Sequence, residues 1–564
     1  MEFPARPAPT QNAPLRFGVI CPGTILSAWQ AQCIRRLLIA NVARPALLLV
    51  QKNAGPTQAG KATGSTQPPR SLWSLYRQCM RVPAERPVSL EADLAGVPAL
   101  CIESAPGLRV SEAVLEQIGA LHLDFILHFG VGLVEEALLR AARYGVWFYL
   151  HGQAPSFGSA APGYAEICAG EPVTMASLRR WVAPECSIVL REGCFKALHH
   201  AYARGLNALL AGSACWPAQV CTDILNGNAD YLEDAPPAPN PPIRPSPGNL
   251  QTVGFLLRQA KSAGAWLWSH LRPGQWNIGI VEAPIQAFLT PGAKPAVRWL
   301  APPAASEFVA DPFALYDGKS LSLLCEQFRY AASRGRIACA QLDLEGRASG
   351  LTAALEMPAH MSYPYLLEHD GEIYCIPETA EAREVALYKA RELPTQWTRV
   401  GTLLADVAAC DSTVFAYEGR WWLLHTDAEE DPNLQLYAWH APSLFGPWQP
   451  HANNPIKTDI RSARPAGTPF FHEGHLYRPA QDASVRYGGR LRLQRILRLT
   501  PTEFREETAA IIAPYAGSPY SQGMHTLAAA GPITLVDGAC YRFNKTAFLA
   551  ALRRAAARLL RAQP

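Results

Sequence analysis

Five polar or aromatic side chains open similar segments in the second half of the chain. They are Asp311, Tyr363, Asp411, Arg464 and His525, at intervals of 52, 48, 53 and 61 residues. Carboxylates, a guanidinium, an imidazole and an aromatic ring are the groups that hold sugars, because hydroxyls take charged hydrogen-bond partners and apolar sugar faces stack on rings. If one fold brings these side chains together, they predict carbohydrate chemistry.

Each of the five residues begins the same structural unit. An apolar strand is followed by a turn that usually carries Gly and then by a second strand. In the first two copies, Glu326 and Glu378 lie at the same offset, fourteen residues after the proline that follows the leading residue. The hairpin therefore returns both glutamates to the end of the unit that holds the leading residue.

Units of about 50 residues suit four-stranded blades, so five copies predict a five-bladed β-propeller. In that fold the innermost strand of each blade begins beside a central channel. The segment from Trp276 to Val281 is expected to supply the strand that closes the ring with the C-terminal material. A β-sandwich whose hairpins look alike by chance is the alternative.

The motifs of this region resemble two kinds of known propeller. Asp311-Pro312 and Asp411 resemble the arabinanase and xylosidase propellers of glycoside hydrolase family 43, in which these positions carry the general base and the carboxylate that tunes the acid. The segments ADPF, HMSYPYLLEHDGEIYCIPET, FGPW, ARPAG, RPAQD and MHTL occur in order between about 277 and 542. They more closely resemble the N-terminal propeller of plant glucosamine inositolphosphorylceramide transferases. That resemblance implies binding of a sugar conjugate and adds Arg478 and Gln481 to the substrate-binding residues.

Hydrolysis by such a propeller requires two carboxyl groups, one to protonate the leaving group and one to activate water. In family 43 the acid is a Glu at the start of the fourth blade, where this chain has Arg464. Glu378 is the candidate to replace that acid beside Asp311 and Asp411. Alternatively, Arg464 binds a carboxylate or phosphate of the ligand and the propeller only binds. A hydrogen bond that holds the hairpin is the purely structural interpretation of each leading residue.

Strands and helices alternate in the first half of the chain. Apolar runs lie at 15–21, 45–50, 99–103, 123–129 and 146–150, with helical periods between them. This alternation predicts a doubly wound α/β domain with a mostly parallel sheet. Ligands of such sheets bind beyond the carboxyl ends of the strands, here near 22–24, 130–132 and 151–153.

The same half resembles the formyltransferases that use 10-formyltetrahydrofolate. The resemblance rests on RFGVICPGTILSAWQAQCIRRLL, LDFILHFGVGLVEEALLRAARYGVWFYLHG and APGYAEICAGEPVTMASLRRW, within about residues 15–199. It implies formyl or acyl transfer to an amino sugar that the propeller presents. The family's histidine, which polarises the formyl carbonyl, corresponds to His151.

The formyltransferase pattern is incomplete in this chain. Tyr149 stands where the family has Asn, and Pro184 or Glu185 falls where it has Asp, so Glu185 is the candidate for that second role. A degenerate domain with a structural role, in which His151 is a polar residue at a strand end, is the alternative. The residues expected near the cofactor are Gly130, Gly132, Gly152 and Gln153.

Composition bounds the remaining possibilities. The chain has 564 residues, of which 49% are hydrophobic and 17% charged, with a formal net charge of +4. This describes a two-domain protein without the basic face of a nucleic-acid binder, and no apolar run is long enough for a membrane span. Fourteen scattered cysteines without a CxxC pair predict reduced thiols in a cytoplasmic protein and no structural metal site.

The expected organisation follows from these features. A disordered tail over 1–14 precedes the α/β domain over 15–230, a linker over 231–250, the propeller over 251–543 and an amphipathic helix over 544–564. The linker rests on seven prolines between Asp234 and Asn249, since proline interrupts helices and central strands. We expect the basic C-terminal helix to be a lid packed on the propeller, with a membrane anchor as the alternative.

Overall fold

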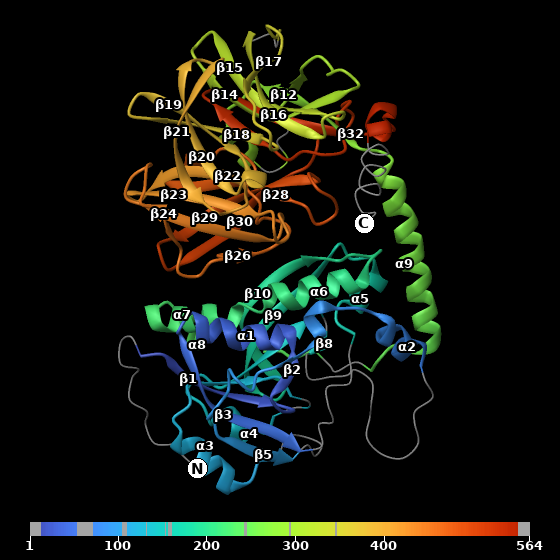
Figure 1. Cartoon of the computed structure of the whole chain (residues 1–564), viewed down its shortest axis with the longest axis vertical. Helices are drawn as coiled ribbons and strands as arrows, with labels where there is room; N and C mark the ends of the chain where they lie inside the picture. The colour runs from blue at the N-terminus through green and yellow to red at the C-terminus, as the bar shows by residue number, and fades with distance from the viewer. Residues whose placement is uncertain are drawn as a thin grey trace, which may run out of the picture. The chain divides into compact units, whose positions relative to one another are not determined.

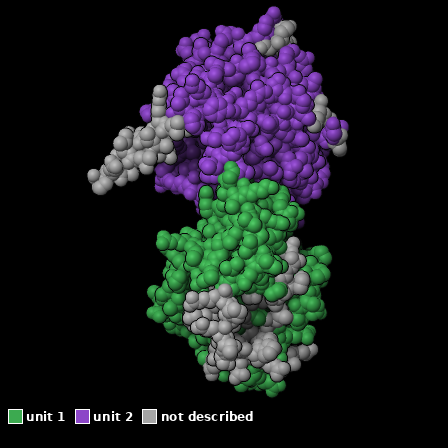
Figure 2. Space-filling view, turned by 90° about the vertical axis from the view of Figure 1, so that its right-hand side faces the viewer, with its two compact units in different colours: residues 1–264 green, residues 265–564 purple. Residues whose placement is uncertain are grey.

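The chain folds into two compact units, residues 1–264 and 265–564 (Figure 2). The computed structural model describes the ranges 13–52, 71–103, 110–130, 134–152, 154–155, 161–241, 245–290, 295–343 and 347–550, together with Gly132 and Gly292. Most of the tail expected over 1–14, Gln153, and residues 551–564 of the expected C-terminal helix lie outside this part of the chain. In the described part, no helix combines the length and hydropathy of a bilayer-spanning segment.

A nine-stranded sheet forms the centre of the first unit (Figure 1). Its parallel strands confirm the predicted α/β fold and stand in the order β5-β3-β1-β6-β7. They are β1 (Leu15–Cys21), β3 (Ala43–Lys52), β5 (Ala99–Glu103), β6 (Phe125–His128) and β7 (Val146–His151). The sheet continues from β7 through the antiparallel strands β9 (Val173–Ala183), β10 (Cys186–Lys196) and β11 (Ala238–Pro239), and β8 (Ala154–Pro155) folds back on β7. Away from this sheet, β2 (Ile25–Ser27) pairs with β4 (Pro87–Ser89).

Helices cover both faces of this sheet, because buried strands carry apolar side chains on both sides. Phe148 of β7 lies in a core with Ile118 and Leu138 on one face, whereas its neighbour Tyr149 bonds to Cys33 and to the carbonyl of Ser213 on the other. The helices are α1 (Ala28–Ile39), α2 (Leu72–Cys79), α3 (Glu112–Ala120), α4 (Glu136–Leu139), α5 (Tyr164–Ala169), α6 (Tyr202–Ser213) and α7 (Trp216–Asn226).

The proline-rich segment differs from a plain linker. Within 231–250 the chain forms helix α8 (Tyr231–Asp234) and strand β11, which pairs with β10 at the edge of the sheet, where a strand tolerates proline. Residues assigned to the propeller from 251 onward instead form most of helix α9 (Asn249–His270). Phe255 anchors α9 in the first unit, because its ring contacts those of Trp73, Tyr76, Tyr164 and Tyr202.

The second unit is a five-bladed propeller, as the repeat predicted (Figure 1). The first blade contains β14 (Glu307–Tyr316), β15 (Ser320–Arg329), β16 (Arg334–Asp343) and β17 (Thr352–Leu355). The second contains β18 (Ser362–His369), β19 (Glu372–Glu378), β20 (Glu384–Glu392) and β21 (Gln396–Ala405). The third contains β22 (Ala409–Tyr417), β23 (Arg420–Asp427), β24 (Gln435–Ala441), β25 (Gln449–Pro450) and β26 (Lys457–Thr458). The fourth contains β27 (Phe470–His472), β28 (His475–Asp482), β29 (Arg490–Leu499) and β30 (Phe504–Ile512).

The fifth blade joins the two ends of the propeller, as expected for the segment near Trp276. Strand β12 (Gly274–Val281) pairs along its whole length with β32 (Ile533–Tyr541), so that Gly274 faces Tyr541 and Val281 faces Thr534. The blade is completed by β13 (Val297–Trp299) and β31 (Leu527–Ala530). After it, a helical segment begins at residue 545 and is described as far as residue 550.

The innermost strands of the first three blades share a β-bulge at the leading residue. Asp311, Tyr363 and Asp411 all have positive φ, at 50°, 43° and 51°. The pairing register with the next strand shifts at the same place in each blade. A non-glycine residue in this conformation costs roughly 1–2 kcal/mol. The same bulge nevertheless recurs at the equivalent position of three blades, so it is a repeated structural element of this propeller.

Gly467 lies where the fourth and fifth blades approach most closely. Its φ is 132°, and a Cβ there would lie 1.9 Å from the carbonyl oxygen of Leu527. We expect Gly467→Ala to lower the free energy of unfolding of the propeller by about 2–4 kcal/mol, because backbone atoms cannot move aside cheaply. Urea denaturation followed by tryptophan fluorescence measures the change.

Gly401→Ala is the matched control, since a Cβ at Gly401 meets no atom within 4 Å. It should change stability by less than about 0.5 kcal/mol. Equal stability of the two variants would contradict the close approach at Gly467.

Candidate functional site

The propeller brings most of the predicted residues into one buried polar cluster. The blade-start residues Asp311, Asp411, Arg464 and His525 meet side chains that return on the second strands of the blades. Pairing of Ala310 with Glu326 and of Ser362 with Glu378 sets this return. The returning side chains are Glu326, Glu378, Gln481 and Asp537, and all the members of the cluster are at most 9% exposed.

A bidentate ion pair holds one side of the cluster. Arg464 donates from Nε to Asp411 Oδ2 at 2.6 Å and from Nη2 to Asp411 Oδ1 at 3.1 Å. Gln481 also donates to Asp411 Oδ2, at 2.7 Å. Glu378 accepts from the Asp411 backbone N–H at 3.0 Å and lies 3.5 Å from Arg464 Nη2. Because Asp411 occupies the guanidinium so fully, Arg464 is poorly placed to bind an anionic group of a ligand.

The second ion pair of the cluster joins His525 and Asp537. His525 Nδ1 is 2.5 Å from Asp537 Oδ2 and 3.6 Å from Asp311 Oδ1. Asp537 also accepts from the backbone N–H groups of His525 at 2.8 Å and Asp311 at 3.3 Å. Asp311 accepts from Thr526 Oγ1 at 2.9 Å and from the Tyr363 backbone N–H at 3.2 Å. The base candidate Asp311 is therefore fixed by hydrogen bonds from two neighbouring blades.

Asp311, His525 and Asp537 also have the spacing of a metal-ligand group. One potential ligand atom from each lies within 4.8 Å of the others. The short contact between His525 and Asp537 is that of an ion pair, which gives this trio a role without a metal.

Glu326 lies against His360, which opens the segment HMSYPYLLEHDGEIYCIPET but was not among the predicted site residues. His360 Nε2 is 3.6 Å from Glu326 Oε1, and His360 Nδ1 accepts from the Gly335 backbone N–H at 2.8 Å. A Cβ on Gly335 would lie 2.5 Å from Glu326 Oε1, so only glycine leaves room for this carboxyl. Burial lowers the pKa of His360, which keeps the imidazole neutral at pH 7.

Burial gives the carboxyl groups different proton affinities. It raises the pKa of Asp311 to about 6, with His525 opposing the shift and the Asp411 charge adding to it. It raises the pKa of Glu378 to about 8, helped by Asp411 and opposed by Arg464. Burial and the charge of Asp311 hold the pKa of Glu326 well above its ordinary value. At neutral pH, Glu326 and Glu378 are thus hydrogen-bond donors as well as acceptors.

His525 carries the positive charge that balances part of this cluster. Burial opposes the charged form, but the Asp537 and Asp311 carboxylates hold the pKa of His525 above its ordinary value. The cluster therefore contains five carboxyl groups and two cationic side chains.

A partly exposed tyrosine lies beside the buried cluster. The Tyr487 ring lies 5.4 Å from the Arg464 guanidinium and meets the His525 ring edge-on at 5.3 Å, and the residue as a whole is 43% exposed. Its hydroxyl group is buried, and this burial, opposed by Arg464 and helped by Asp311, holds the pKa of Tyr487 well above its ordinary value. The ring of Trp276 stacks on that of His525, with 3.9 Å between the ring centroids. Gly488 lets the loop approach this tryptophan, since a Cβ there would lie 2.4 Å from the Trp276 ring. Tyr487 thus lies where the polar cluster meets the surface of the propeller, with its hydroxyl group buried.

Two predicted substrate-binding residues lie elsewhere. Tyr363 is 0% exposed; its ring packs on Phe313 and its hydroxyl accepts from the Gly467 backbone N–H at 2.7 Å. Arg478 forms a buried ion pair with Glu506, donating from Nε at 2.7 Å. Both residues support the blades rather than face a ligand.

His151 is enclosed between the sheet and its helices. Strand β7 carries it inside the sheet, paired with Ala176, and its Nε2 lies 3.1 Å from Ser213 Oγ. The Tyr149 ring stacks on it at 5.3 Å, and the side chain is 1% exposed. Burial lowers the pKa of His151 to about 3. This histidine is a neutral core residue without access to a substrate.

Glu185 lies far from His151. Pairing along β7 and β9 sets His151 beside Ala176, whereas Glu185 lies in the exposed turn beyond Ala183. The seven residue steps from Ala176 to Ala183 along the strand span roughly 23 Å. The two residues that the formyltransferase resemblance pairs therefore cannot act on one group.

The protein's own side chains occupy the space near the glycines expected at a folate. A Cβ on Gly130 would lie 2.2 Å from Gln51 Oε1, and a Cβ on Gly152 would lie 2.7 Å from Glu166 Oε1. Gly132 alone has no atom within 4 Å of such a Cβ. At two of the three described glycines, side chains of the protein thus lie close to the backbone that a folate would approach.

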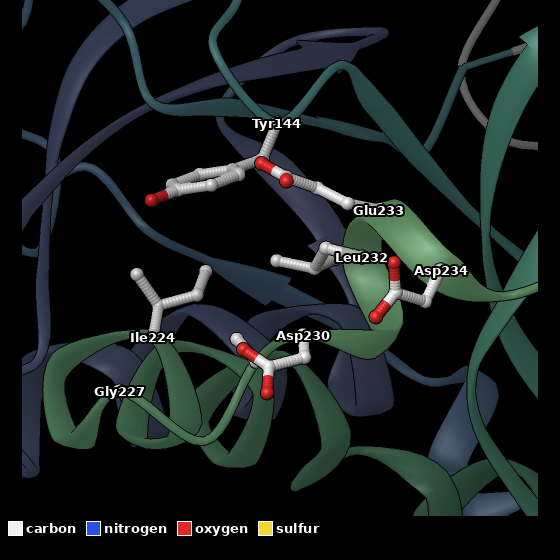
Figure 3. Close-up of a pocket in the computed structure, with 8 residues that line it drawn as sticks. Tyr144, Ile224, Gly227, Asp230, Leu232, Glu233 and Asp234 are labelled. Carbon is white, nitrogen blue, oxygen red and sulfur yellow. The ribbon is translucent and has the colours of Figure 1, made fainter.

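A hollow of about 240 Å³ in the first unit lies away from this region (Figure 3). The Tyr144 ring borders it, together with the carboxylates of Asp230, Glu233 and Asp234. Tyr144 precedes β7, whereas His151 ends that strand, so the hollow lies at the amino rather than the carboxyl end of β7. It is not the ligand position that the strand order predicted.

Sequence reasoning missed Asp537 and Tyr487. Asp537 lies in the second strand of its blade, as Glu326 and Glu378 do in theirs. It follows His525 by 12 residues, whereas the two glutamates follow their leading residues by 15, so the offset of the first two blades does not find it. Tyr487 lies in a loop outside the repeat, and nothing in the sequence signals its contact with Arg464.

Comparison with known proteins supports the resemblance of the propeller. Residues 296–516 match the family model for the N-terminal region of glucosamine inositolphosphorylceramide transferase 1. The propeller resembles this family. Proteins of that name from Oryza sativa subsp. japonica and Arabidopsis thaliana are 38% and 36% identical to the chain over 207 residues. These residues make up 36% of this chain but 28% and 27% of the relatives, so the chain spans under a third of the relatives' length.

Solved structures with a similar fold share little sequence with the chain. Zg3597, a family 117 glycoside hydrolase from the marine bacterium Zobellia galactanivorans, has a TM-score of 0.32 and 14% identity, covering 47% of this chain and 90% of its own. The family 43 protein BlXynB from Bacillus licheniformis has a TM-score of 0.27 and 14% identity, covering 36% and 43%. At this level of similarity, these structures add nothing about function.

The raised pKa of Glu378 makes the stability of the propeller depend on pH. The folded state retains a proton that the unfolded chain releases between its ordinary value of 4.5 and about 8, so stability falls as the pH rises through this window. We expect Glu378→Gln to remove this part of the decline and to raise the free energy of unfolding at pH 9 by roughly 1–3 kcal/mol. Urea denaturation at a series of pH values measures the difference.

Glu372→Gln on the exposed edge of the same strand is the control, and it should leave the pH profile unchanged. A Glu378→Gln profile parallel to that of the wild type would show that Glu378 is ionised in the folded protein.

Proposed function

We propose that the propeller binds the sugar part of a glycoconjugate at the cluster beneath Tyr487. One observation carries the proposal: a partly exposed tyrosine, Tyr487, lies directly beside buried carboxyl groups that outnumber the cations. An apolar sugar face would stack on Tyr487, and hydroxyl groups would bond to the rim of the cluster. The named activity of the matching relatives, which concerns a sugar conjugate, agrees with this proposal.

The charge balance favours an amino or neutral sugar over an acidic one. Asp411 already pairs with Arg464, and Asp537 with His525, so neither cation is free for a carboxylate or phosphate. Asp311 and Glu378 lie 3.6 Å from His525 and 3.5 Å from Arg464, but each cation has a closer carboxylate partner. Together with Glu326, these carboxyl groups favour a donor-rich or positively charged group. Glucosamine, which is part of the relatives' name, is such an amino sugar.

Hydrolysis at the same cluster is the second candidate. Glu378, with a pKa of about 8, holds a proton at neutral pH, whereas Asp311, with a pKa of about 6, has largely lost its own. Two carboxyl groups whose pKa values differ in this way can serve as the acid and the base in glycoside cleavage. Against this candidate, both groups are at most 8% exposed, which favours binding at the rim.

Sugar binding should depend on the Tyr487 ring. We expect isothermal titration with methyl glucosaminide to show saturable binding that is tighter than with methyl glucoside and much tighter than with glucuronic acid. Tyr487→Ala should weaken this binding at least tenfold, since loss of a stacking ring corresponds to about 1.4 kcal/mol.

Phe471→Ala is the matched control, because Phe471 is an aromatic residue with 54% exposure on the same blade. Equal affinity of the Tyr487→Ala variant, or no saturable binding of any sugar, would contradict the proposal. Release of nitrophenol from arabinose, xylose or galactose glycosides, lost in Asp311→Asn, would move the conclusion to hydrolysis.

Formyl transfer to an amino sugar remains a separate prediction from the first unit. Because His151 is enclosed and Gln51 and Glu166 fill the space at two of the glycines, we expect titration with a folate analogue to give no binding in the micromolar range. Fluorescence or calorimetric titration of the full chain measures this. Clear micromolar binding that Gly132→Trp abolishes would restore the formyltransferase interpretation.

A further inference from the structure

Helix α9, which begins in the first unit and ends in the second, presents a regular apolar stripe that the described residues leave exposed. The residues Leu250, Val253, Leu257, Ala260, Gly264 and Leu267 follow one another at intervals of three and four, and we call them the α9 seam. Leu250 is 89% exposed, Leu257 67% and Leu267 62%. The seam is an unpartnered helix face that extends along most of α9.

The opposite face of α9 is the one that attaches to the first unit. Phe255 is 1% exposed in its aromatic cluster, Thr252 is 0% exposed, and Gln259 donates to the Tyr76 hydroxyl at 2.9 Å. Attachment through this face fixes the helix and leaves the seam directed away from it. The exposure of the seam is therefore not the result of a loosely held helix.

The spacing of the seam is that of a helix-to-helix contact. Apolar residues that alternate three and four apart form the narrow stripe by which two helices pack along their length. Such a stripe on a helix of 22 residues extends over about three heptads, or roughly 33 Å. The expected occupant is accordingly another helix.

The two smallest residues of the seam, Ala260 and Gly264, indicate which helix can pack against it. When two copies of α9 run antiparallel about a two-fold axis between Arg258 and Gln259, Val253 lies opposite Gly264 and Leu257 opposite Ala260. Leu250 then lies opposite Leu267 at both ends. In the inner layers a larger side chain thus meets a smaller one, which is the complementarity that an isologous interface requires.

Charge does not oppose this arrangement. Helix α9 has no acidic residue, and its only lysine, Lys261, would lie beside Gly254 of the second copy rather than beside a like charge. A Cβ on Gly254 or Gly264 would meet no atom within 4 Å, so both positions have room for an approaching side chain. From these features we infer that two copies of this chain associate through an antiparallel pairing of their α9 seams.

A lipid surface is a poorer occupant of the same face. A helix that lies on a membrane buries a broad face with bulky side chains. Helix α9 exposes Leu256, Trp266 and Trp268 outside the seam, but the centre of the seam itself is formed by the small residues Ala260 and Gly264. Arg258 is already bonded to the Cys168 carbonyl oxygen, which leaves few basic groups for anionic headgroups.

Sedimentation velocity of the full chain over about 1–100 µM tests the inference. The wild type should be dimeric, and Leu257→Asp/Leu267→Asp should weaken association at least about 100-fold, because both changed residues lose their apolar partners. Leu497→Asp, a change at a 50% exposed leucine of the propeller, should leave the dimer intact. Circular dichroism and thermal melting of each variant show that the fold is retained.

Gly264→Leu separates the possible occupants. The added side chain has open space in the monomer but would collide with Val253 of a second copy, so it should weaken the dimer at least tenfold. On vesicles of phosphatidylserine and phosphatidylcholine, the same change would strengthen binding. A monomeric wild type overturns the inference, as does vesicle binding that Leu257→Asp/Leu267→Asp abolishes. Dimerisation only after removal of residues 551–564 also overturns it, because that segment would then be the occupant.

Discussion

The buried pair of Arg464 and Asp411 determines how the centre of the propeller is arranged. Removing two charges from water costs several kcal/mol per ion, and only a well-formed pair with further hydrogen bonds offsets that cost. Here the guanidinium binds both oxygens of Asp411, Gln481 adds a third hydrogen bond, and Glu378 lies at the edge of the same group. The neutralised Asp411 leaves the remaining acids to set the character of the site.

The consequence is a clear distinction between support and function within one cluster. Arg464 occupies the position of a catalytic acid in the family 43 pattern, yet its geometry is that of a structural cation. The carboxyl groups with a raised pKa are Asp311, Glu326 and Glu378, and these are not members of the two closest ion pairs, Arg464 with Asp411 and His525 with Asp537. A change of one residue type at the start of the fourth blade therefore alters the chemistry of side chains contributed by the other blades.

The sequence was a good guide to the fold wherever a pattern repeats. Five leading residues at near-equal intervals predicted the number of blades, and the offset of Glu326 and Glu378 predicted their return to the centre. Contacts that depend on how the blades and helices pack could not be predicted from the sequence. Tyr363 begins its blade with the same bulge as Asp311, but its ring packs on Phe313, and only the packed blades reveal this. His151 follows a strand in the sequence, while the position of Ser213 on α6, which encloses it, is set by the tertiary fold. Helix α9 was not predicted, because the propeller was assigned to begin directly after the proline-rich segment, at residue 251.

The pairing of β12 with β32 has a consequence for how the chain acquires its structure. Gly274 and Tyr541 are partners at opposite ends of the propeller sequence, so the ring cannot close until almost the whole unit has left the ribosome. Single blades emerge earlier with unpaired edges, and the fifth blade is assembled last from both ends of the unit. Premature termination within β32 would release an open, edge-exposing arc instead of a smaller closed protein, and such an arc is a substrate for chaperones and proteases.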